Sequence, residues 1–312
     1  MKDKHLKNLV REKLDAFIRQ STSSAPHIIM TIFGISILPH GEEIWLGSLA
    51  KLLKPLGINE RLVRTAVFRL TKDSWLKGNK VGRKSFYSLN DEHKVEFEKT
   101  EQSIFYQPDN WDGDWRLVVG VSMEKTCEKR QQFRKALLRN GFSSVAPHVF
   151  AHPTFSVEEI KSLLNQYDQG QFHVILNACD AESKPLKFVE VEGILHRDTR
   201  EFLQEKYQEF IDEYQDIAGN VDCIDELSSE ECFLINTLVM NDYRHLLWHD
   251  KIGSNILLDE EWIGHQTRQL VATLYCAFEK QSRVHFCSIA ENENGALPST
   301  PSSYKKRFKY LS

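Results

Sequence analysis

The sequence predicts an α+β protein of more than one domain, with helices and strands mixed in its first two regions and helices alone in its last. Three observations lead to this: the length, the uneven charge, and the order of helical and strand-like patterns. The chain has 312 residues, and a single hydrophobic core stops growing at roughly 250–300 residues. Apolar residues make up 41% and charged residues 27%, which is typical of folded proteins and excludes wholesale disorder and coiled-coil rods.

The charge is divided unevenly along the chain. Lys and Arg number 40 and Asp and Glu 44, which gives a formal net charge of −4. Residues 51–84 contain ten basic and two acidic residues, whereas residues 182–261 contain seven basic and twenty acidic residues. The first segment is suited to binding a polyanion, and the second would repel one.

Cysteine spacing and hydropathy indicate a cytoplasmic protein. The six cysteines include no CxxC pair, so a zinc ribbon and a CxxC redox motif are excluded, and we expect small buried thiols in a reducing compartment. The longest apolar run, residues 28–38, is too short for a bilayer, which needs about 20 residues. Acidic residues near the start and the lack of a cleavage site after this run argue against a signal peptide. We therefore expect no membrane contact.

The first folded region is expected at residues 25–106, after a charged and Ser/Thr-rich segment, residues 1–24, that we expect to be flexible. The patterns predict a buried helix at 28–38, a short strand at 44–46, a helix from 48 to about 55, a helix from 60 to about 73, a β-hairpin at 75–89 and a helix from 90 to about 105. Asn59 is a good N-cap for the helix that begins at residue 60, and the hairpin has a Gly-containing, basic tip.

The predicted helix at 60–73 has one apolar and one cationic side. At about 100° per residue, the apolar side, expected to be buried, consists of Val63, Ala66, Val67 and Leu70. The other side carries Arg61, Arg64, Thr65, Phe68, Arg69 and Lys72. A helix-turn-helix followed by a basic hairpin is the pattern of a winged helix-turn-helix, whose second helix lies in the major groove of DNA.

The residue types on the cationic side suit two kinds of DNA contact. Arginine can bond to both guanine O6 and N7, and Thr or Phe can contact the thymine methyl group, so we expect Arg61, Arg64, Thr65, Phe68 and Arg69 to read bases. Phosphate contacts, which give affinity rather than sequence reading, are expected from Lys72, Lys80, Arg83 and Lys84. The alternatives are a solvated, charged helix face with a basic loop and, for Phe68, a subunit contact.

The remaining chain predicts a mixed middle domain and a helical end. Residues 112–182 follow the order βαββαβ, the ferredoxin-like arrangement, with strands at 115–122, 143–145, 148–152 and 172–178 and helices at 124–140 and 156–167. A further short strand is expected at 188–191, a linker at 108–113, and a helical domain over 188–290 with helices near 198–217, 229–248 and 260–284. Residues 291–312 are expected to form a flexible basic tail.

No catalytic, metal or cofactor site can be assembled from the sequence. Residues 78–85 resemble a Walker A loop but have the wrong spacing, and a strand follows where a helix is required. His245 and His249 stand four residues apart on a predicted helix, a spacing that can bind zinc, but no HExxH motif accompanies them, and surface or packed histidines are favoured. Because no nucleophile, base and orienting group can be combined, we expect a protein that is not an enzyme.

Several segments closely resemble the PaaX family, the bacterial transcriptional repressors of phenylacetic acid degradation. Residues 56–70 read LGINERLVRTAVFRL and residues 82–89 read GRKSFYSL. Further matching segments are 42–50, 75–76, 111–118 and 134–142. The resemblance extends from about residue 25 to about residue 285, and its N-terminal motif is long and specific.

This resemblance implies a fold, partners and a ligand. It implies a winged-helix N-domain, a ferredoxin-like middle domain similar to Cas2, and a helical C-domain. It also implies a homodimer on double-stranded, palindromic operator DNA that is released by phenylacetyl-CoA. The effector site should be partly apolar for the aryl group and partly cationic for the CoA phosphates. Its candidates are Arg244, Trp248 and Trp262, for which a packed helix interface is the alternative.

The chain departs from the family in the helical region. After residues 243–247, members of the family usually carry an Asp-Pro followed by a Leu-Pro, whereas this chain reads Asp250-Lys251-Ile252-Gly253. We expect a differently shaped helix end here, which puts in doubt the effector contacts that this motif carries in the family.

Three rival functions stay open beside the repressor. A Cas2-like metal-dependent nuclease, or nucleic-acid-binding protein, would need a carboxylate at the end of the first middle-domain strand for metal binding. That strand ends in Val121-Ser122-Met123, and Asp114 lies at its start. The second rival is a regulator sensing a different aryl-CoA, and the third is an acyl-CoA enzyme fused to a DNA-binding module.

Overall fold

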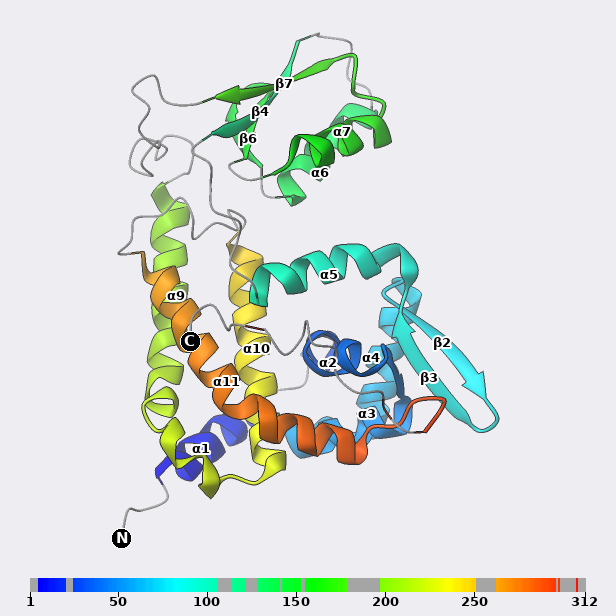
Figure 1. Ribbon diagram of the computed structural model, residues 1–312, viewed down its shortest axis with the longest axis vertical. Coiled ribbons are helices and arrows are strands. Elements are labelled where there is room, and N and C mark those ends of the chain that lie inside the picture. The colour runs from blue at the N-terminus through cyan, green and yellow to red at the C-terminus, as the bar shows by residue number, and fades with distance from the viewer. Residues whose placement is uncertain are drawn as a thin grey trace. The chain divides into compact units, whose positions relative to one another are not determined.

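The computed structural model (Figure 1) describes residues 5–20, 25–105, 114–121, 128–140, 142–152, 155–178, 197–250, 262–295, 297 and 307. The chain forms two compact units. The first contains Met1–Gln107, Glu209–His245 and Thr267–Ser312, and the second contains Pro108–Gln208 and Leu246–Gln266. The N-terminal region and most of the helical region, expected as separate domains, therefore belong to one unit.

The first unit begins with short helices and a small antiparallel sheet. Its elements are α1 (His5–Gln20), α2 (Ala25–Ile32), η1 (Phe33–Ile37), η2 (Leu38–His40), β1 (Glu43–Trp45), α3 (Leu46–Leu53), η3 (Lys54–Leu56), α4 (Glu60–Lys72), β2 (Leu76–Val81), β3 (Lys84–Leu89) and α5 (Asp91–Phe105). The strands are ordered β1-β3-β2, and both pairs are antiparallel. Apart from the first helix, this is the order of elements that the sequence predicts.

The expectation of a flexible segment at residues 1–24 is wrong for α1. Leu6, Val10 and Leu14 are buried along one side of this helix, because residues four apart lie on the same face. The Lys13 ammonium forms an ion pair with Asp242 at 3.0 Å and another with Glu213. The many charges of this segment lie between the few buried apolar positions, so its composition does not indicate a packed helix.

The predicted buried helix at 28–38 is divided into three parts. The α-helix α2 continues as the π-helical turn η1 and the 3-10 turn η2, and every residue from 31 to 40 is buried. A Cβ atom at Gly34 would lie only 2.3 Å from the Glu101 carboxylate of α5. A side chain at position 34 would therefore require the Glu101 carboxylate to move from the place it occupies here.

Part of the C-terminal segment, expected to be a flexible tail from residue 291, is fixed in the first unit. Arg307 is buried, and its guanidinium donates to the backbone oxygens of Gly34 at 2.8 Å and Ile35 at 3.2 Å. It also donates to the Tyr275 hydroxyl and lies 3.9 Å from the centre of the Phe105 ring. The backbone oxygens of a buried π-helical turn need hydrogen-bond donors. The Arg307 guanidinium, near the end of the chain, is the donor for two of them.

In the later part of the chain the structure describes four helical segments: α9 (Arg197–Ala218), η4 (Val221–Glu226), α10 (Ser229–His249) and α11 (Ile263–Ile289). They confirm the predicted helical region, and α9, α10 and α11 each contribute residues to both units. Residues 232–241 of α10 are buried without a break, which is the pattern of a helix enclosed on all sides. No described helix is long and apolar enough to cross a membrane.

The second unit contains the predicted βαββαβ order. Its elements are β4 (Trp115–Gly120), α6 (Glu128–Arg139), β5 (Ser143–Ala146), β6 (Val149–His152), α7 (Val157–Gln166) and β7 (His173–Ala178). The strands are ordered β5-β6-β4-β7, with every pair antiparallel. A capping box between Ser156 and Glu159 begins α7. The linker at 108–113 and the strand at 188–191 lie outside the described residues.

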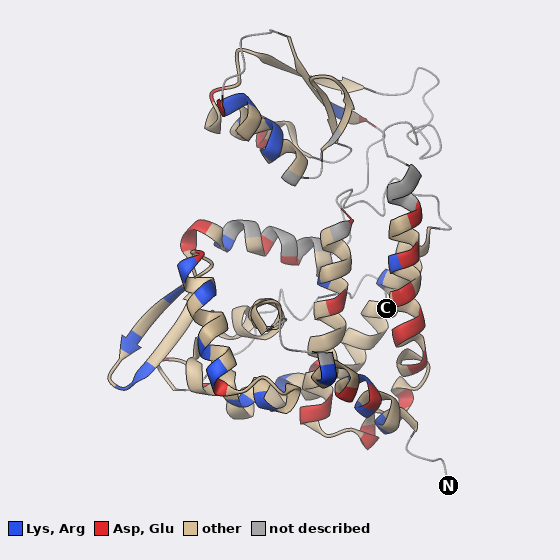
Figure 2. Ribbon diagram, turned by 180° about the vertical axis from the view of Figure 1, so that it is seen from behind, with Lys and Arg blue, Asp and Glu red and all other residues tan. Residues whose placement is uncertain are grey.

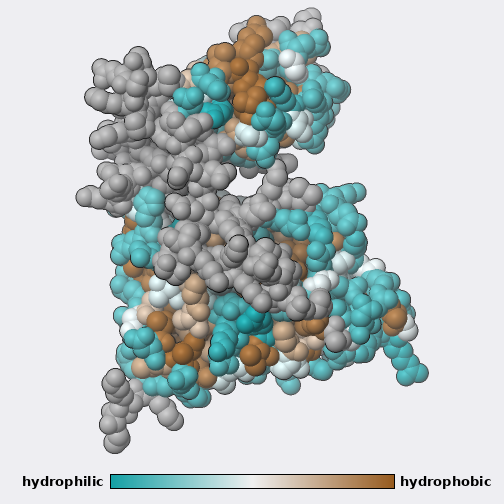
Figure 3. Space-filling view, in the orientation of Figure 1, coloured by the Kyte–Doolittle hydropathy of each residue, from teal (hydrophilic) through white to brown (hydrophobic). Residues whose placement is uncertain are grey.

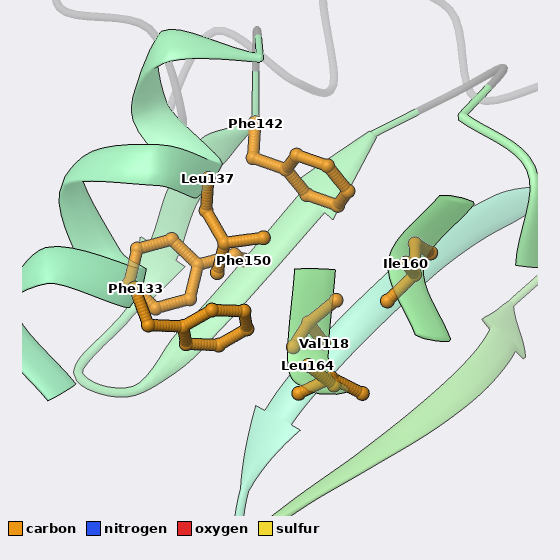
Figure 4. Close-up of a cluster of buried hydrophobic side chains, with 7 residues drawn as sticks. All are labelled: Val118, Phe133, Leu137, Phe142, Phe150, Ile160 and Leu164. Atoms are coloured by element: carbon orange, nitrogen blue, oxygen red, sulfur yellow. The ribbon is translucent and has the colours of Figure 1, made fainter. Parts of the chain in front are cut away.

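Helices α6 and α7 contribute to one hydrophobic core. Figure 4 shows side chains from α6, α7 and the sheet pointing toward one another. The cluster consists of Val118, Phe133, Leu137, Phe142, Phe150, Ile160 and Leu164. His152, next to this core, is largely buried, and burial lowers the pKa of its imidazole to about 4. This shared core explains why α6 and α7 lie on the same face of the sheet.

Candidate nucleic-acid interface

Helix α4 has the buried and exposed sides that the sequence predicts. The Asn59 side chain accepts a hydrogen bond from the Leu62 backbone N–H at 3.0 Å and caps the helix. The four predicted apolar residues are buried, and α4 packs against α2 and α3. The buried residues are Val63, Ala66, Val67 and Leu70. Since the apolar side is used for packing, the opposite side is fixed toward solvent.

The exposed side of α4 consists of Arg61, Arg64, Thr65, Phe68, Arg69 and Lys72. Figure 2 shows basic residues repeated along this helix. Phe68 is 69% exposed, so its ring does not fold back onto its own helix. The Arg64 guanidinium pairs with Glu60 at 2.6 Å, but exposed pairs of this spacing are worth only about 0.3–0.5 kcal/mol. A stronger anionic partner can therefore displace Glu60 at little cost.

The hairpin of β2 and β3 provides a second cationic surface beside α4. Val81 pairs with Lys84 at its end, and Gly82 turns the chain with φ of +60°. Lys80 and Arg83 are exposed, and no carboxylate in the described parts of the chain lies within 4.0 Å of either. The surface of this hairpin is mainly hydrophilic in Figure 3. Lys80 and Arg83 are therefore open to an anion from outside.

Lys84 differs from Lys80 and Arg83, the two cations at the tip of the hairpin, because it has a carboxylate partner. Its ammonium forms an ion pair with Glu291 and lies 4.3 Å from the centre of the Trp45 ring. The pairing with Lys84 holds the pKa of the Glu291 carboxyl below its usual value. No sequence pattern indicates this contact, because the two residues are 207 positions apart.

The three effector candidates have unlike surroundings. Arg244 pairs with the buried Glu101 carboxylate and lies 5.0 Å from the centre of the Phe97 ring, and burial lowers the pKa of its guanidinium to about 10. Trp262 is buried, with its ring edge-on to Tyr207 at 5.8 Å. Trp248 is 80% exposed. Arg244 and Trp262 are thus packing residues in this structure, and Trp248 is the accessible one.

The histidine and acidic candidates are only partly described by the structure. His245 lies edge-on to His27, with 4.6 Å between ring centres, and the side chain of His249 lies outside the described part of the structure. Asp114 precedes β4, and residues 122–127 are likewise not described. Among the residues that are described, no three His, Cys, Asp or Glu side chains are grouped as metal ligands would be.

Comparisons with known proteins cover nearly the whole chain. Three family models match: PaaX-like protein at residues 24–93, PaaX protein central Cas2-like domain at 108–187, and PaaX-like protein C-terminal domain at 199–288. The transcriptional repressor PaaX of Escherichia coli strain K12 is 32% identical over 305 residues, which is 95% of each chain. A solved structure, the uncharacterized protein Rv0674 from Mycobacterium tuberculosis, covers 76% of this chain and 89% of its own at 19% identity and a TM-score of 0.45.

These matches first define the class: a protein of several domains in which a Cas2-like domain is placed between an N-terminal and a helical C-terminal domain. The βαββαβ unit is the structural counterpart of the central match. The chain belongs to the PaaX family.

Proposed function

We propose that this protein is a DNA-binding transcriptional repressor in which α3, α4 and the β2–β3 hairpin act as a winged helix-turn-helix. The observation that carries the proposal is the pairing of two open cationic surfaces, the outer side of α4 and the hairpin tip, on adjacent elements. A helix of this kind fits the major groove, and a hairpin beside it reaches the flanking backbone. The 32% identity to a transcriptional repressor supports the same function.

Within this proposal the residues of the two surfaces divide into two sets. Those on α4 read base edges, and they are Arg61, Arg64, Thr65, Phe68 and Arg69. Each good base contact contributes about 1–3 kcal/mol of discrimination. Contacts to the phosphates of the DNA backbone are made by Lys72, Lys80, Arg83 and Lys84. Each phosphate contact increases the salt dependence of binding by about one ion.

The proposed ligand is phenylacetyl-CoA, and the proposed assembly is a cytoplasmic homodimer on palindromic operator DNA. The support is the family membership of the chain and the properties that the PaaX resemblance implies. Release of DNA requires the ligand to bind the DNA-incompetent state more tightly than the competent one. Trp248 is the candidate whose ring is open for stacking on an aryl group. The CoA phosphates require cations that the candidate residues do not supply in an exposed form.

Fluorescence anisotropy tests this proposal directly. The protein is titrated into labelled DNA from upstream of the phenylacetate genes of the host and into a scrambled duplex, with and without phenylacetyl-CoA at fixed salt. We expect tight binding to the first duplex, weak binding to the second, and loss of the difference when the thioester is added. Selective binding that ignores the thioester would remove the proposed ligand and keep the DNA-binding function. Equal binding to both duplexes would contradict the repressor function.

A further inference from the structure

The segment that follows α11 is attached to the hairpin and to β1. We call residues 291–293, which read Glu-Asn-Glu, the acidic clip. Two backbone hydrogen bonds join it to β1: the Trp45 N–H donates to the Glu291 oxygen at 2.8 Å, and the Glu293 N–H donates to the Glu43 carboxylate at 3.0 Å. Ser48 of α3 joins the clip to the end of α11, since its hydroxyl donates to the Ile289 oxygen and accepts from the Glu291 N–H.

These bonds keep the acidic clip close to the hairpin whether or not its side chains are paired. The Glu291 carboxylate reaches Lys84, and the Glu293 carboxylate accepts from the Asn79 side chain at 3.1 Å. A group tethered in this way has a high effective concentration at its target. Any phosphate that approaches Lys84 must therefore compete with a carboxylate of the same molecule.

The position of Lys84 makes this competition relevant to DNA. Lys84 pairs with Val81 at the end of the hairpin, next to the open cations Lys80 and Arg83. Its side chain keeps 45% of its exposure, and that of Glu291 keeps 38%. The ion pair is thus formed at the surface, where a phosphate can replace the carboxylate with a bond of the same charge-assisted kind.

We propose that the acidic clip is an intramolecular competitor of the DNA backbone. In the free protein the Glu291 carboxylate forms an ion pair with the Lys84 ammonium. When DNA binds, a backbone phosphate replaces this carboxylate as the partner of Lys84. The inference rests on the proposed function, because it requires that the hairpin contacts DNA. Its consequence is weaker binding to every duplex, whatever the sequence, since a phosphate contact carries no sequence information.

A double-mutant cycle on full-length protein tests the exchange. Operator and scrambled duplexes are titrated at fixed salt with wild type, Glu291→Gln, Lys84→Gln and the double variant. Glu291→Gln should tighten both duplexes about two- to five-fold, the range expected for an exposed ion pair. Lys84→Gln should weaken both, and in that background Glu291→Gln should have no more effect than the control variant Glu293→Gln.

Two further variants distinguish the loss of the ion pair with Lys84 from the general effect of removing a negative charge near the DNA. Glu293→Gln removes the same charge two residues away and breaks no ion pair with any cation that the structure describes, so it reports the long-range effect alone and should change affinity less than Glu291→Gln. Glu291→Asp keeps the charge and shortens the side chain by one methylene group. It should weaken the contact with Lys84 and tighten DNA binding, although the net charge is unchanged. Thermal unfolding monitored by circular dichroism verifies that each variant is folded.

The outcomes distinguish this inference from the proposed function. If wild type prefers the operator but Glu291→Gln binds no more tightly, or if Glu293→Gln has an equal effect, the competitor is refuted and the repressor function stands. If wild type shows no preference but Glu291→Gln tightens both duplexes through Lys84, the competitor stands and sequence-specific repression is refuted. If no variant binds any duplex, both are refuted.

Discussion

The basic residues of the first unit fall into two groups with opposite surroundings. On α4 and the hairpin, the cations are exposed, and their pairs are few and lie at the surface. Arg307 is instead buried against backbone oxygens of the π-helical turn, and Arg244, whose side chain is 18% exposed, pairs with the buried Glu101 carboxylate. The first group can change partners at little cost, whereas the second holds helices together. Residue type alone therefore does not show which arginine binds a ligand.

The largest effect is expected at the buried pair. Arg244→Met leaves the Glu101 carboxylate, only 7% exposed, without its ionic partner. Breaking a buried pair in this way costs about 3–5 kcal/mol, and denaturant unfolding measures the loss. The double variant Arg244→Met, Glu101→Gln should recover most of it, because no buried charge then remains. A loss below about 1 kcal/mol in the single variant would show that Arg244 belongs with the exposed group.

The second unit contains a buried basic group whose effect depends on pH. The pKa of His152 is lowered to about 4 by burial, which outweighs the opposing charge of Glu159. The native state therefore requires neutral imidazole. Above about pH 6.5, His152 does not lower the free energy of unfolding. As the pH falls from about 6.5 to about 4, the free energy of unfolding decreases, and below about pH 4 this loss is constant. The shift corresponds to about 3 kcal/mol.

Unfolding at several pH values, with His152→Gln as the comparison, measures this contribution. Other histidines also titrate, including the buried His40 and His285 and the half-buried His173, whose pKa values are lowered by desolvation. They remain in both proteins, so the difference between wild type and variant isolates His152. Parallel pH curves for the two proteins would show that His152 is solvated in the native state.

The exposed group was more accessible to sequence reasoning than the buried one. The spacing of Val63, Val67 and Leu70 fixes which side of α4 is buried, and Asn59 marks where the helix begins, so the cationic side follows from local patterns. The βαββαβ order followed for the same reason, since each of its elements has a clear period. Phe68, predicted on the outer side, is indeed exposed.

The buried group depends on contacts between distant parts of the chain. Arg307 lies 273 residues from Gly34, and the π-helical turn it supports has no distinct sequence pattern. The same limit applies to one contact of the exposed group, since Glu291 and Lys84 are 207 positions apart. Sequence periodicity reports which side of an element is buried but not what covers it. For this reason the sequence predicts flexible segments at residues 1–24 and 291–312, although parts of both are packed.

Arg64 gives a smaller effect that is confined to DNA binding. Arg64→Ala removes an exposed guanidinium whose partner in the free protein is Glu60, so stability should change by less than about 0.5 kcal/mol. Affinity for the operator should fall by about 1–3 kcal/mol, and the preference at one base pair should relax. Arg19→Ala, which removes a basic residue from the exposed part of α1, is the control for lost charge. An equal loss from both variants would place Arg64 outside the base-reading set.

The smallest effect is expected at the tip of the hairpin, where two lysines can be compared directly. Lys80→Gln should weaken operator and scrambled duplexes equally and lower the slope of log affinity against log salt by about one. Lys84→Gln should weaken binding less than Lys80→Gln, because Lys84 must first leave Glu291, whereas Lys80 has no carboxylate to leave in the described structure. Anisotropy titrations over a salt series measure both quantities. A larger loss at Lys84 would mean that Glu291 positions this lysine for the phosphate instead of competing with it.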